Sequence, residues 1–381
     1  MKLKRKLSEF LKRETVLTVA VFLAIVSAVM IPPDREYAGY IDFRTLSILF
    51  CLMTVMAGLQ KLGVFRNIAK TLLRYTQNTI QLVEVLILLC FFFSMIITND
   101  VSLITFVPFT IIVLRLTGEE AVKKLAVPVI VLQTVAANLG SMLTPIGNPQ
   151  NLYLYGKTQM SAGTFILLML PYSLVSLLLL VICGVIVAKR SRIEVRGAEV
   201  LLTEDEKLEQ KKYLLPAYLL LFVLCLLTVA HLIPYPVTLV TVALAVLLLD
   251  RGTIIKVDYS LLLTFVGFFI FIGNMGRMPA FCDFLQKIIG GREVMTAVIA
   301  SQVISNVPAA LLLSGFTENI TALIIGTNLG GLGTLIASMA SLISYKQVAR
   351  QIPGEKKKYF GWFTIANIVF LMILVLENCL L

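Results

Sequence analysis

The sequence predicts an all-α protein that crosses a membrane several times, and three observations support this fold class. Of the 381 residues, 58% are hydrophobic and only 14% are charged, whereas a soluble domain is usually about 25% charged. Several apolar stretches reach the roughly 20 residues that a helix needs to cross a bilayer. Residues 212–232 and 359–376 are apolar all round and lack the polar face of a helix in a soluble protein. We therefore do not expect a soluble enzyme.

About nine transmembrane helices and two interrupted segments follow from the order of the apolar runs. The interrupted segments, 79–115 and 293–316, contain Thr98-Asn99-Asp100 and Ser305-Asn306-Val307-Pro308 midway. Polar backbone at membrane depth is tolerated only where it is buried in protein or lines a wet cavity, so we predict two re-entrant hairpins. The crossings are expected at residues 14–32, 44–62, 124–141, 164–188, 212–232, 236–250, 258–276, 320–342 and 359–378.

The net charge of +11 comes largely from basic residues in short loops between apolar runs. That placement is typical of membrane orientation, and we expect no nucleic-acid partner. With the N-terminus in the cytoplasm and the C-terminus outside, all but six of the 33 Lys and Arg fall on the cytoplasmic side. The prediction is a multi-pass protein of the plasma or inner membrane. The six outside are Arg35, Arg44, Lys157, Arg277, Lys287 and Arg292, and we interpret Lys157 and Arg277 as solvated loop charges.

The two halves of the chain resemble each other. Residues 42–65 are similar to residues 258–281, and Asn138-Leu139-Gly140 recurs 190 residues later as Asn328-Leu329-Gly330. Because the second and seventh crossings run in opposite directions, we predict two inverted repeats, which are typical of secondary transporters. The predicted units are 1–188 (hairpin tip 98–100, helix break 138–151), a cytoplasmic linker 189–211, and 212–381 (hairpin tip 305–308, helix break 327–341).

The two hairpin tips and the two broken helices are the candidate binding elements. Helix N-termini offer amides to an anion, and opposite helix ends offer carbonyls to Na⁺. Ordinary packing between membrane helices explains any one Gly or Thr here, but the matching positions in both halves favour a site. The predicted substrate-binding residues are Thr98, Asn99, Thr144, Asn148, Ser305, Asn306, Thr327, Asn328 and Thr334.

Asp100 is the acidic side chain that the sequence places well inside the membrane. A carboxylate at mid-depth costs on the order of 3 kcal/mol, which favours a functional role for it. We predict that it binds the coupling ion, either H⁺ or Na⁺, and expect no organic cofactor. The alternative is a protonated Asp100 that only caps the second arm of the hairpin. The predicted coupling-ion residues are Asn99, Asp100, Asn138, Gly147 and Asn306, with Na⁺ at Asn99, Asp100 and Asn138.

At these motifs the chain resembles the ion transporter superfamily, over roughly residues 40–380. The segment ITNDVSLITFVPF (97–109) is most similar to the arsenite and citrate permease branch, and LTPIGNPQNLYLY (143–155) supports this. Symporters of the superfamily carry Ser-Asn-Thr at each tip, a motif from which Asp100 and Val307 depart. The departures favour proton coupling or a different anion over a two-sodium dicarboxylate mechanism. The resemblance also implies a homodimer and elevator-type alternating access.

The leading hypothesis is a secondary active transporter of a small anion in the lipid bilayer, coupled to Na⁺ or H⁺. A di- or tricarboxylate ranks first among substrates, followed by arsenite or another oxyanion. The rivals with the same fold are a Na⁺/H⁺ antiporter and an arsenite efflux permease. The rival from another class is a passive ion channel, which conducts without coupling and without saturation.

Overall fold

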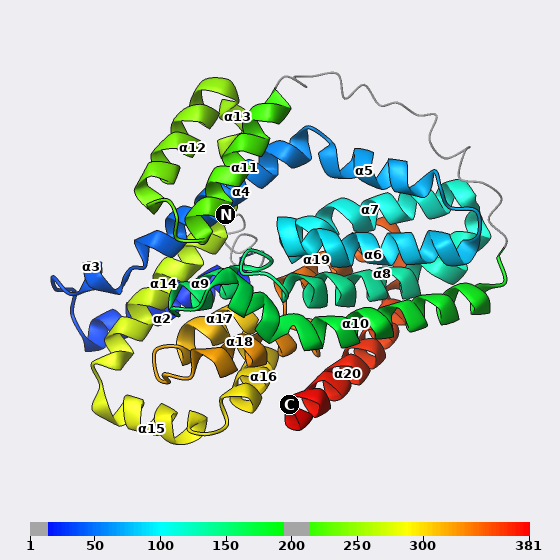
Figure 1. Cartoon of the computed structure of the whole chain (residues 1–381). Helices are drawn as coiled ribbons and strands as arrows, with labels where there is room; N and C mark the ends of the chain where they lie inside the picture. The colour runs from blue at the N-terminus through cyan, green and yellow to red at the C-terminus, as the bar shows by residue number, and fades with distance from the viewer. Residues whose placement is uncertain (1–13, 194–213) are drawn as a thin grey trace, which may run out of the picture.

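The computed structural model describes residues 14–193 and 214–381, and within them it contains helices and no strand. Residues 194–211 of the predicted linker 189–211, and the basic segment before residue 14, lie outside the described residues, whereas residues 189–191 are helical. The helices (Figure 1) are α2 (Thr15–Met30), α3 (Tyr37–Tyr40), α4 (Phe43–Lys61), α5 (Val64–Leu73), α6 (Thr79–Ile97), α7 (Asn99–Thr117), α8 (Glu119–Ser141), α9 (Pro149–Gly156), α10 (Ala162–Ser191), α11 (Leu215–Val229), α12 (Tyr235–Leu249), α13 (Arg251–Ile254), α14 (Tyr259–Gly276), α15 (Pro279–Ile289), α16 (Glu293–Ile304), α17 (Asn306–Leu313), α18 (Ile320–Leu329), α19 (Met339–Gln351) and α20 (Lys356–Leu380).

Seven helices in the described part of the chain are long and apolar enough to cross a membrane: α4, α6, α7, α8, α10, α14 and α20 with the short turn before it. Helices α2, α11 and α12 are apolar but shorter. The chain is thus an all-α polytopic membrane protein, as predicted. Both arms of the first hairpin, α6 and α7, belong to the long group, whereas α16 and α17 of the second hairpin have 12 and 8 residues.

Two predicted crossings differ from the observed helices. Helix α8 begins at Glu119, five residues before the predicted start, because its charged first turn is helical; acidic residues are favourable at a helix N-terminus. The predicted crossing 320–342 is divided into α18 and α19, and α19 continues to Gln351. The break between them falls inside the interval 327–341, where it was expected.

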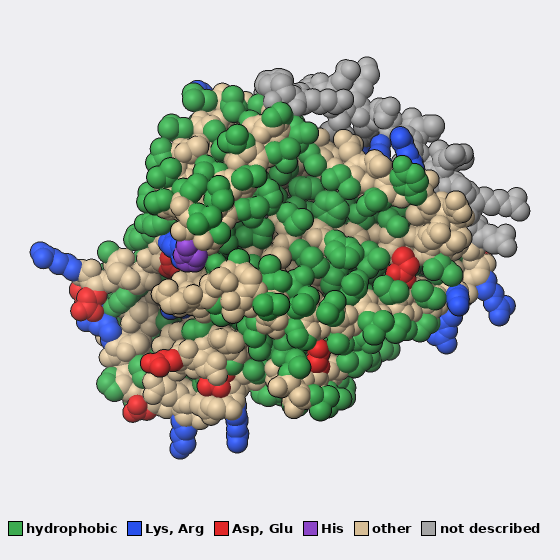
Figure 2. Space-filling model, viewed as in Figure 1, with side chains coloured by type: hydrophobic (Ala, Val, Ile, Leu, Met, Phe, Trp, Pro, Cys, Tyr) green, Lys and Arg blue, Asp and Glu red, His purple; other side chains and the backbone are tan. Residues whose placement is uncertain are grey.

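The outer surface carries long stripes of apolar side chains, whose exposure to water would be unfavourable. On α10, the side chains of Leu167, Leu174, Leu178 and Ile182 are each between 47% and 68% exposed. Their spacing along the helix places them on one side of it, and Figure 2 shows hydrophobic side chains over much of this face of the molecule, with Lys and Arg at its edges. Contiguous exposed apolar surface of this extent marks contact with another apolar phase, here the lipid.

Close helix packing brings the first hairpin against α8. Helices α6, α7, α8 and α10 lie side by side in the right half of Figure 1. At Gly140 of α8, an added Cβ atom would lie 2.0 Å from the carbonyl oxygen of Phe91 in α6. At Gly330, the residue that follows α18, an added Cβ atom would lie 2.6 Å from the Ser301 hydroxyl of α16. Small residues let membrane helices approach closely, and both glycines belong to the repeated Asn-Leu-Gly motif.

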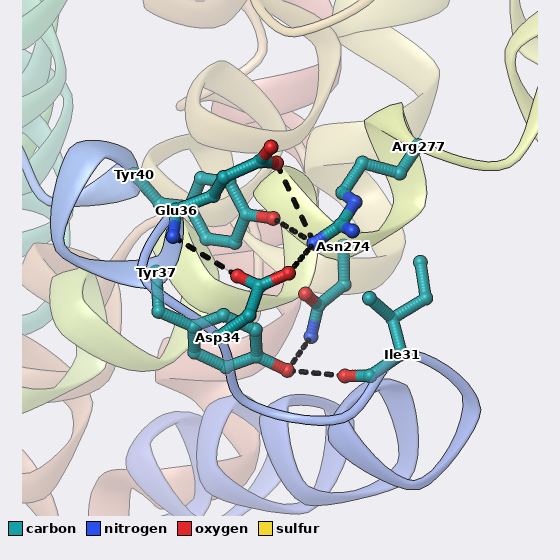
Figure 3. Close-up of polar contacts among 7 residues, drawn as sticks. All are labelled: Ile31, Asp34, Glu36, Tyr37, Tyr40, Asn274 and Arg277. Carbon is teal, nitrogen blue, oxygen red and sulfur yellow. Dashed lines mark hydrogen bonds and ion pairs between the residues drawn. The ribbon is translucent and has the colours of Figure 1, made fainter.

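The loop between α2 and α4 is tied to the end of α14 by Arg277 (Figure 3). Its guanidinium lies 2.6 Å from Asp34 and 3.5 Å from Glu36, and it donates a hydrogen bond to the Tyr40 hydroxyl at 3.1 Å. Arg277 is therefore exposed, as predicted, but it is also ion-paired and fixes the loop to the helix end, a structural role that the sequence did not predict. Lys157 also has a partner, because its ammonium lies 5.4 Å from the centre of the Tyr153 ring.

Candidate functional site

Each hairpin turns at a single residue in an unusual backbone conformation. Thr98 has φ 72° and ψ 152°, and Ser305 has φ 74° and ψ 153°. These values lie close to a region that is essentially restricted to glycine and that costs on the order of 1–3 kcal/mol. The turns are narrower than the predicted tips 98–100 and 305–308, since Asn99 and Asn306 already begin α7 and α17.

The tip of each hairpin is hydrogen-bonded to the helix break of its own half. The backbone N–H of Asn99 donates to the carbonyl oxygen of Gly147 at 3.2 Å, and that of Asn306 donates to Ala337 at 2.9 Å. A second bond accompanies each: the Thr144 hydroxyl donates to the carbonyl of Met95, and the Thr334 hydroxyl to that of Gln302. Corresponding residues lie 207 apart in the hairpins and 190 apart in the breaks.

The two helix breaks are joined to each other by buried side chains. Asn148 donates to Oδ1 of Asn328 at 3.0 Å, and Ser338 donates to Oδ1 of Asn138 at 3.0 Å. Asn328 then donates to Oδ1 of Asn151 at 2.6 Å, and Asn138 donates to Oγ of Ser341 at 3.3 Å. The partners in each pair of bonds again lie 190 residues apart. The network therefore relates the two halves residue by residue.

A cavity of about 200 Å³ opens beside the first tip, between α4, α7, α9 and the start of α14. Its wall is mostly apolar, with Leu49, Met53 and Ile104 among the lining residues. The polar and charged residues that line it are Gln60, Thr98, Asp100, Asn148, Lys256 and Asp258. A mostly apolar hollow with a few convergent polar groups is the usual form of a small-molecule site.

Asp100 lies in the first turn of α7 and is half-buried at the wall of this cavity. Thr98, the residue before α7, makes no side-chain cap, and the Asp100 carboxylate accepts no hydrogen bond from the described residues. Its backbone N–H donates to Oδ1 of Asn99 at 2.9 Å. The carboxylate is thus available to a ligand from the cavity, and a capping role has no support in the geometry.

The structure brings only some of the predicted residues to the cavity. Thr98, Asp100 and Asn148 line it, and Asn99 is linked behind them to Oδ1 of Asn138 at 3.2 Å. Asn138 has its oxygen occupied by Asn99 and Ser338, so a cation there requires those bonds to rearrange. The carbonyl of Gly147 is used by Asn99.

The predicted residues of the second half do not line this cavity. Ser305 and Asn306 are buried at the second tip, and Thr327 is buried with its hydroxyl donating to the Leu323 carbonyl. Thr334 is exposed. Asn328 reaches the site indirectly, because its partner Asn148 lines the cavity wall.

Sequence reasoning missed Lys256, Asp258, Ser338 and Ser341. Asp258 accepts a hydrogen bond from the backbone N–H of Leu261 and so caps α14, as Asp42 caps α4. That Asp-aromatic repeat was visible in the sequence, but its position at a cavity was not. The offset of 190 would have paired Ser338 and Ser341 with Asn148 and Asn151.

A second hollow, of about 310 Å³, lies near the other end of α9. Asn148 and Leu152 of this segment line the first cavity, whereas Tyr153 and Lys157 line the second. The Tyr153 ring packs against Phe265 and Phe269, with centroids 6.2 and 5.6 Å apart, and its hydroxyl is hydrogen-bonded to Ser314. The segment around α9 therefore contributes to two separate hollows, and the second is lined by Tyr153 and Phe269 of this aromatic cluster.

Comparison with known proteins gives a consistent result. A family model described as citrate transporter matches residues 7–320. An uncharacterized transporter of Methanocaldococcus jannaschii is 31% identical over 342 residues, 89% of each chain, and the inner membrane protein YbiR of Escherichia coli is 32% identical over 82% of each chain. The silicon efflux transporter LSI3 of Oryza sativa subsp. japonica is 32% identical over 157 residues, which are 40% of this chain and 31% of the rice protein. With its membrane-spanning helices and this match over most of its length, the chain belongs to the citrate transporter family.

Proposed function

We propose that the protein is a secondary active transporter that carries a small anion across the membrane, coupled to Na⁺ or H⁺, through the cavity beside Thr98 and Asp100. The single observation that carries the proposal is the Asp100 carboxylate, which faces the cavity from the first turn of α7 without a partner in the described residues. An intramembrane carboxylate at a cavity is typical of an ion-coupling site.

The charges of the cavity explain why the anion and the coupling ion would bind together. Asp100 and Asp258 both line it, and Lys256 is the only lining residue of opposite charge. Two like charges 4 Å apart repel by about 4 kcal/mol at an effective dielectric constant of 20. A proton or Na⁺ on Asp100 removes the repulsion between its carboxylate and an incoming anion, so the anion binds well only when Asp100 carries the coupling ion. Symport follows from this linkage.

Alternating access would use the two halves as inverted repeats that move as an elevator. The matching hydrogen bonds of Asn99 and Asn306, and those of Asn138 and Asn328, support a repeat at the level of single residues. In this proposal Asn99 and Asn138 support the ion site from behind, and Asn306 takes the equivalent position at the second tip. The N-terminus and Lys256 would face the cytoplasm, the C-terminus would lie outside, and two copies would form a dimer.

A di- or tricarboxylate is the first candidate substrate, and a weak oxyacid such as arsenite is the second. The second is favoured by the two acidic residues of the cavity, which repel a multiply charged anion, and by the similarity of part of the chain to a silicon efflux transporter. A proton-coupled efflux permease or a Na⁺/H⁺ antiporter would use the same Asp100.

Transport by the purified protein in proteoliposomes tests the proposal. Accumulation of citrate, succinate or arsenite would be measured under an imposed Na⁺ or H⁺ gradient, and again after both gradients are collapsed. Saturable, gradient-dependent accumulation of one solute supports the proposal. A sodium-driven proton flux that no solute affects would assign an antiporter, and non-saturating flux without coupling would assign a channel.

A further inference from the structure

A groove on the outside of the helix bundle is larger than the two hollows described above and shares no lining residue with either. It has a volume of about 520 Å³ and lies between α8, α10 and α20. Lys123 and Lys124 of α8, Arg190 of α10 and Lys358 of α20 line it together with apolar side chains. No residue of this groove lines the Asp100 cavity, so the proposed transport site does not account for it.

The four basic residues gather at one end of the groove. Lys123 and Lys124 are near the start of α8, Lys358 is in the first turn of α20, and Arg190 is in the last turn of α10. Glu120 pairs with Lys124 at 2.7 Å, and Glu355 pairs with Lys358 at 3.2 Å. Lys123 and Arg190 are exposed and have no carboxylate partner in the described residues. This end of the groove therefore keeps an excess of positive charge.

From the basic end, the groove runs along apolar helix surface. At 1.5 Å per residue, Leu132 lies about 12 Å from Lys124 along α8, and Phe370 lies about 18 Å from Lys358 along α20. Ile365 and Val369, which also line the groove, are 66% and 47% exposed. These side chains face the lipid, because they belong to the exposed apolar stripe of a membrane-crossing helix.

Trp362 marks the depth at which the charged and apolar parts meet. It lines the groove one turn after Lys358 and is 41% exposed. Tryptophan is enriched at the membrane–water interface, where headgroups lie. The groove thus presents cations at the level of the lipid headgroups and an apolar wall at the level of the acyl chains.

We propose that this groove binds one anionic phospholipid, with its phosphate at Lys123 and Arg190 and an acyl chain along α8 and α20. Basic pockets between transmembrane helices recognise anionic headgroups. A small free anion would use the basic end and leave the apolar wall bare. A zwitterionic lipid would bring its own cation to a site that already has an excess of positive charge.

Native mass spectrometry of the full-length protein in detergent, titrated with dioleoylphosphatidylglycerol or dioleoylphosphatidylcholine, tests the proposal. We expect one phosphatidylglycerol to bind in preference to phosphatidylcholine. The double variant Lys123→Ala/Arg190→Ala is expected to weaken that binding about twenty-five-fold, since each basic residue near an anionic lipid contributes about a factor of five. The control double variant Lys287→Ala/Arg292→Ala removes two exposed cations that do not line the groove.

A second variant tests the apolar half without changing any charge. Ala366→Trp would fill the apolar part of the groove below Lys358. It is expected to abolish phosphatidylglycerol binding and to leave the binding of inorganic phosphate, which would use only the basic end, unchanged. Three results would overturn the proposal: equal binding of the two lipids, binding unaffected by both variants, or inorganic phosphate competing fully with the lipid. A dimer that Ala366→Trp dissociates would instead assign the groove to a second copy of the chain.

Discussion

The side-chain amide of Asn148 donates a hydrogen bond of 3.0 Å to Oδ1 of Asn328, and this bond joins the helix break of the first half to that of the second. Asn148 also lines the cavity that contains Asp100. The hydrogen bond between Asn148 and Asn328 therefore links the second helix break directly to the cavity wall. Because Asn328 also donates to Asn151 and to the carbonyl of Ile324, all its polar atoms are used.

Replacement of Asn328 by Ala should destabilise the protein and impair transport. The change leaves the Asn151 oxygen buried without a partner, at a cost of about 1–3 kcal/mol, and leaves the Asn148 amide with only its 3.3 Å bond to the Ser141 hydroxyl. Thermal unfolding in detergent and transport in proteoliposomes measure the two effects. Asn67→Ala is the control, because Asn67 is exposed on α5. An Asn328→Ala protein as stable and active as the control would exclude a bridging role.

Replacement of Thr98 by Gly should raise the melting temperature. Glycine relieves the strain of the tip, about 1–3 kcal/mol, and loses about 0.5–1 kcal/mol to its greater freedom in the unfolded chain, so a gain of about 1 kcal/mol remains. Thr98→Ala is the matched control, since it removes the same side-chain atoms and keeps the Cβ. If the melting temperature of Thr98→Ala is equal to or higher than that of Thr98→Gly, the tip is not strained.

Replacement of Gly140 by Ala should force α6 away from α8 and lower the melting temperature. The new Cβ would lie 2.0 Å from the Phe91 carbonyl, which is backbone and cannot rotate away. Overpacking of this kind costs about 1–3 kcal/mol. Gly163→Ala serves as control, because only the Ser161 hydroxyl, at 3.7 Å, is near its added Cβ. Equal melting temperatures for the two variants would contradict the close approach.

The Arg277 cluster in Figure 3 predicts a dependence of stability on pH. The hydrogen bond from Arg277 holds the pKa of Asp34 below its ordinary value of 3.8. A carboxyl group with a lowered pKa stabilises the folded state above its ordinary pKa, and the effect is lost as the pH falls through the folded-state value. Arg277→Gln should therefore lower the melting temperature at pH 7 and have less effect near pH 3. A constant difference between the two pH values would mean that the ion pair does not contribute.

Much of the helical framework could be predicted because apolar runs end at residues that cap helices. Asp42, Asn148 and Asp258 each accept a hydrogen bond from the backbone three residues later, at the start of α4, α9 and α14. Hydropathy does not detect polar helix, so the first turn of α8 and the end of α19 were missed. The hairpin turns were predicted close to their positions because Thr98-Asn99 and Ser305-Asn306 interrupt long apolar runs.

The candidate site was harder to predict than the helices. The prediction grouped both tips and both breaks around one substrate, whereas the cavity contains Thr98, Asp100 and Asn148 and none of the predicted residues of the second half. The contribution of Asp258 depends on how α14 packs against α4, which no local pattern encodes. The bonds of Asn138 with Ser338 and Ser341 join residues about 200 positions apart and follow from tertiary packing.

The most direct test of the account is ion-driven solute accumulation by Asp100→Asn in proteoliposomes, beside Asp283→Asn as a control for the loss of an exposed carboxylate. Asparagine keeps the shape of the side chain but cannot bind a proton, and it neutralises the charge that a sodium ion would need. We expect the variant to fold with an unchanged melting temperature and to accumulate no solute above equilibrium, while the control accumulates it normally. Accumulation by Asp100→Asn with its ion dependence intact would contradict the assignment of Asp100 as the coupling residue.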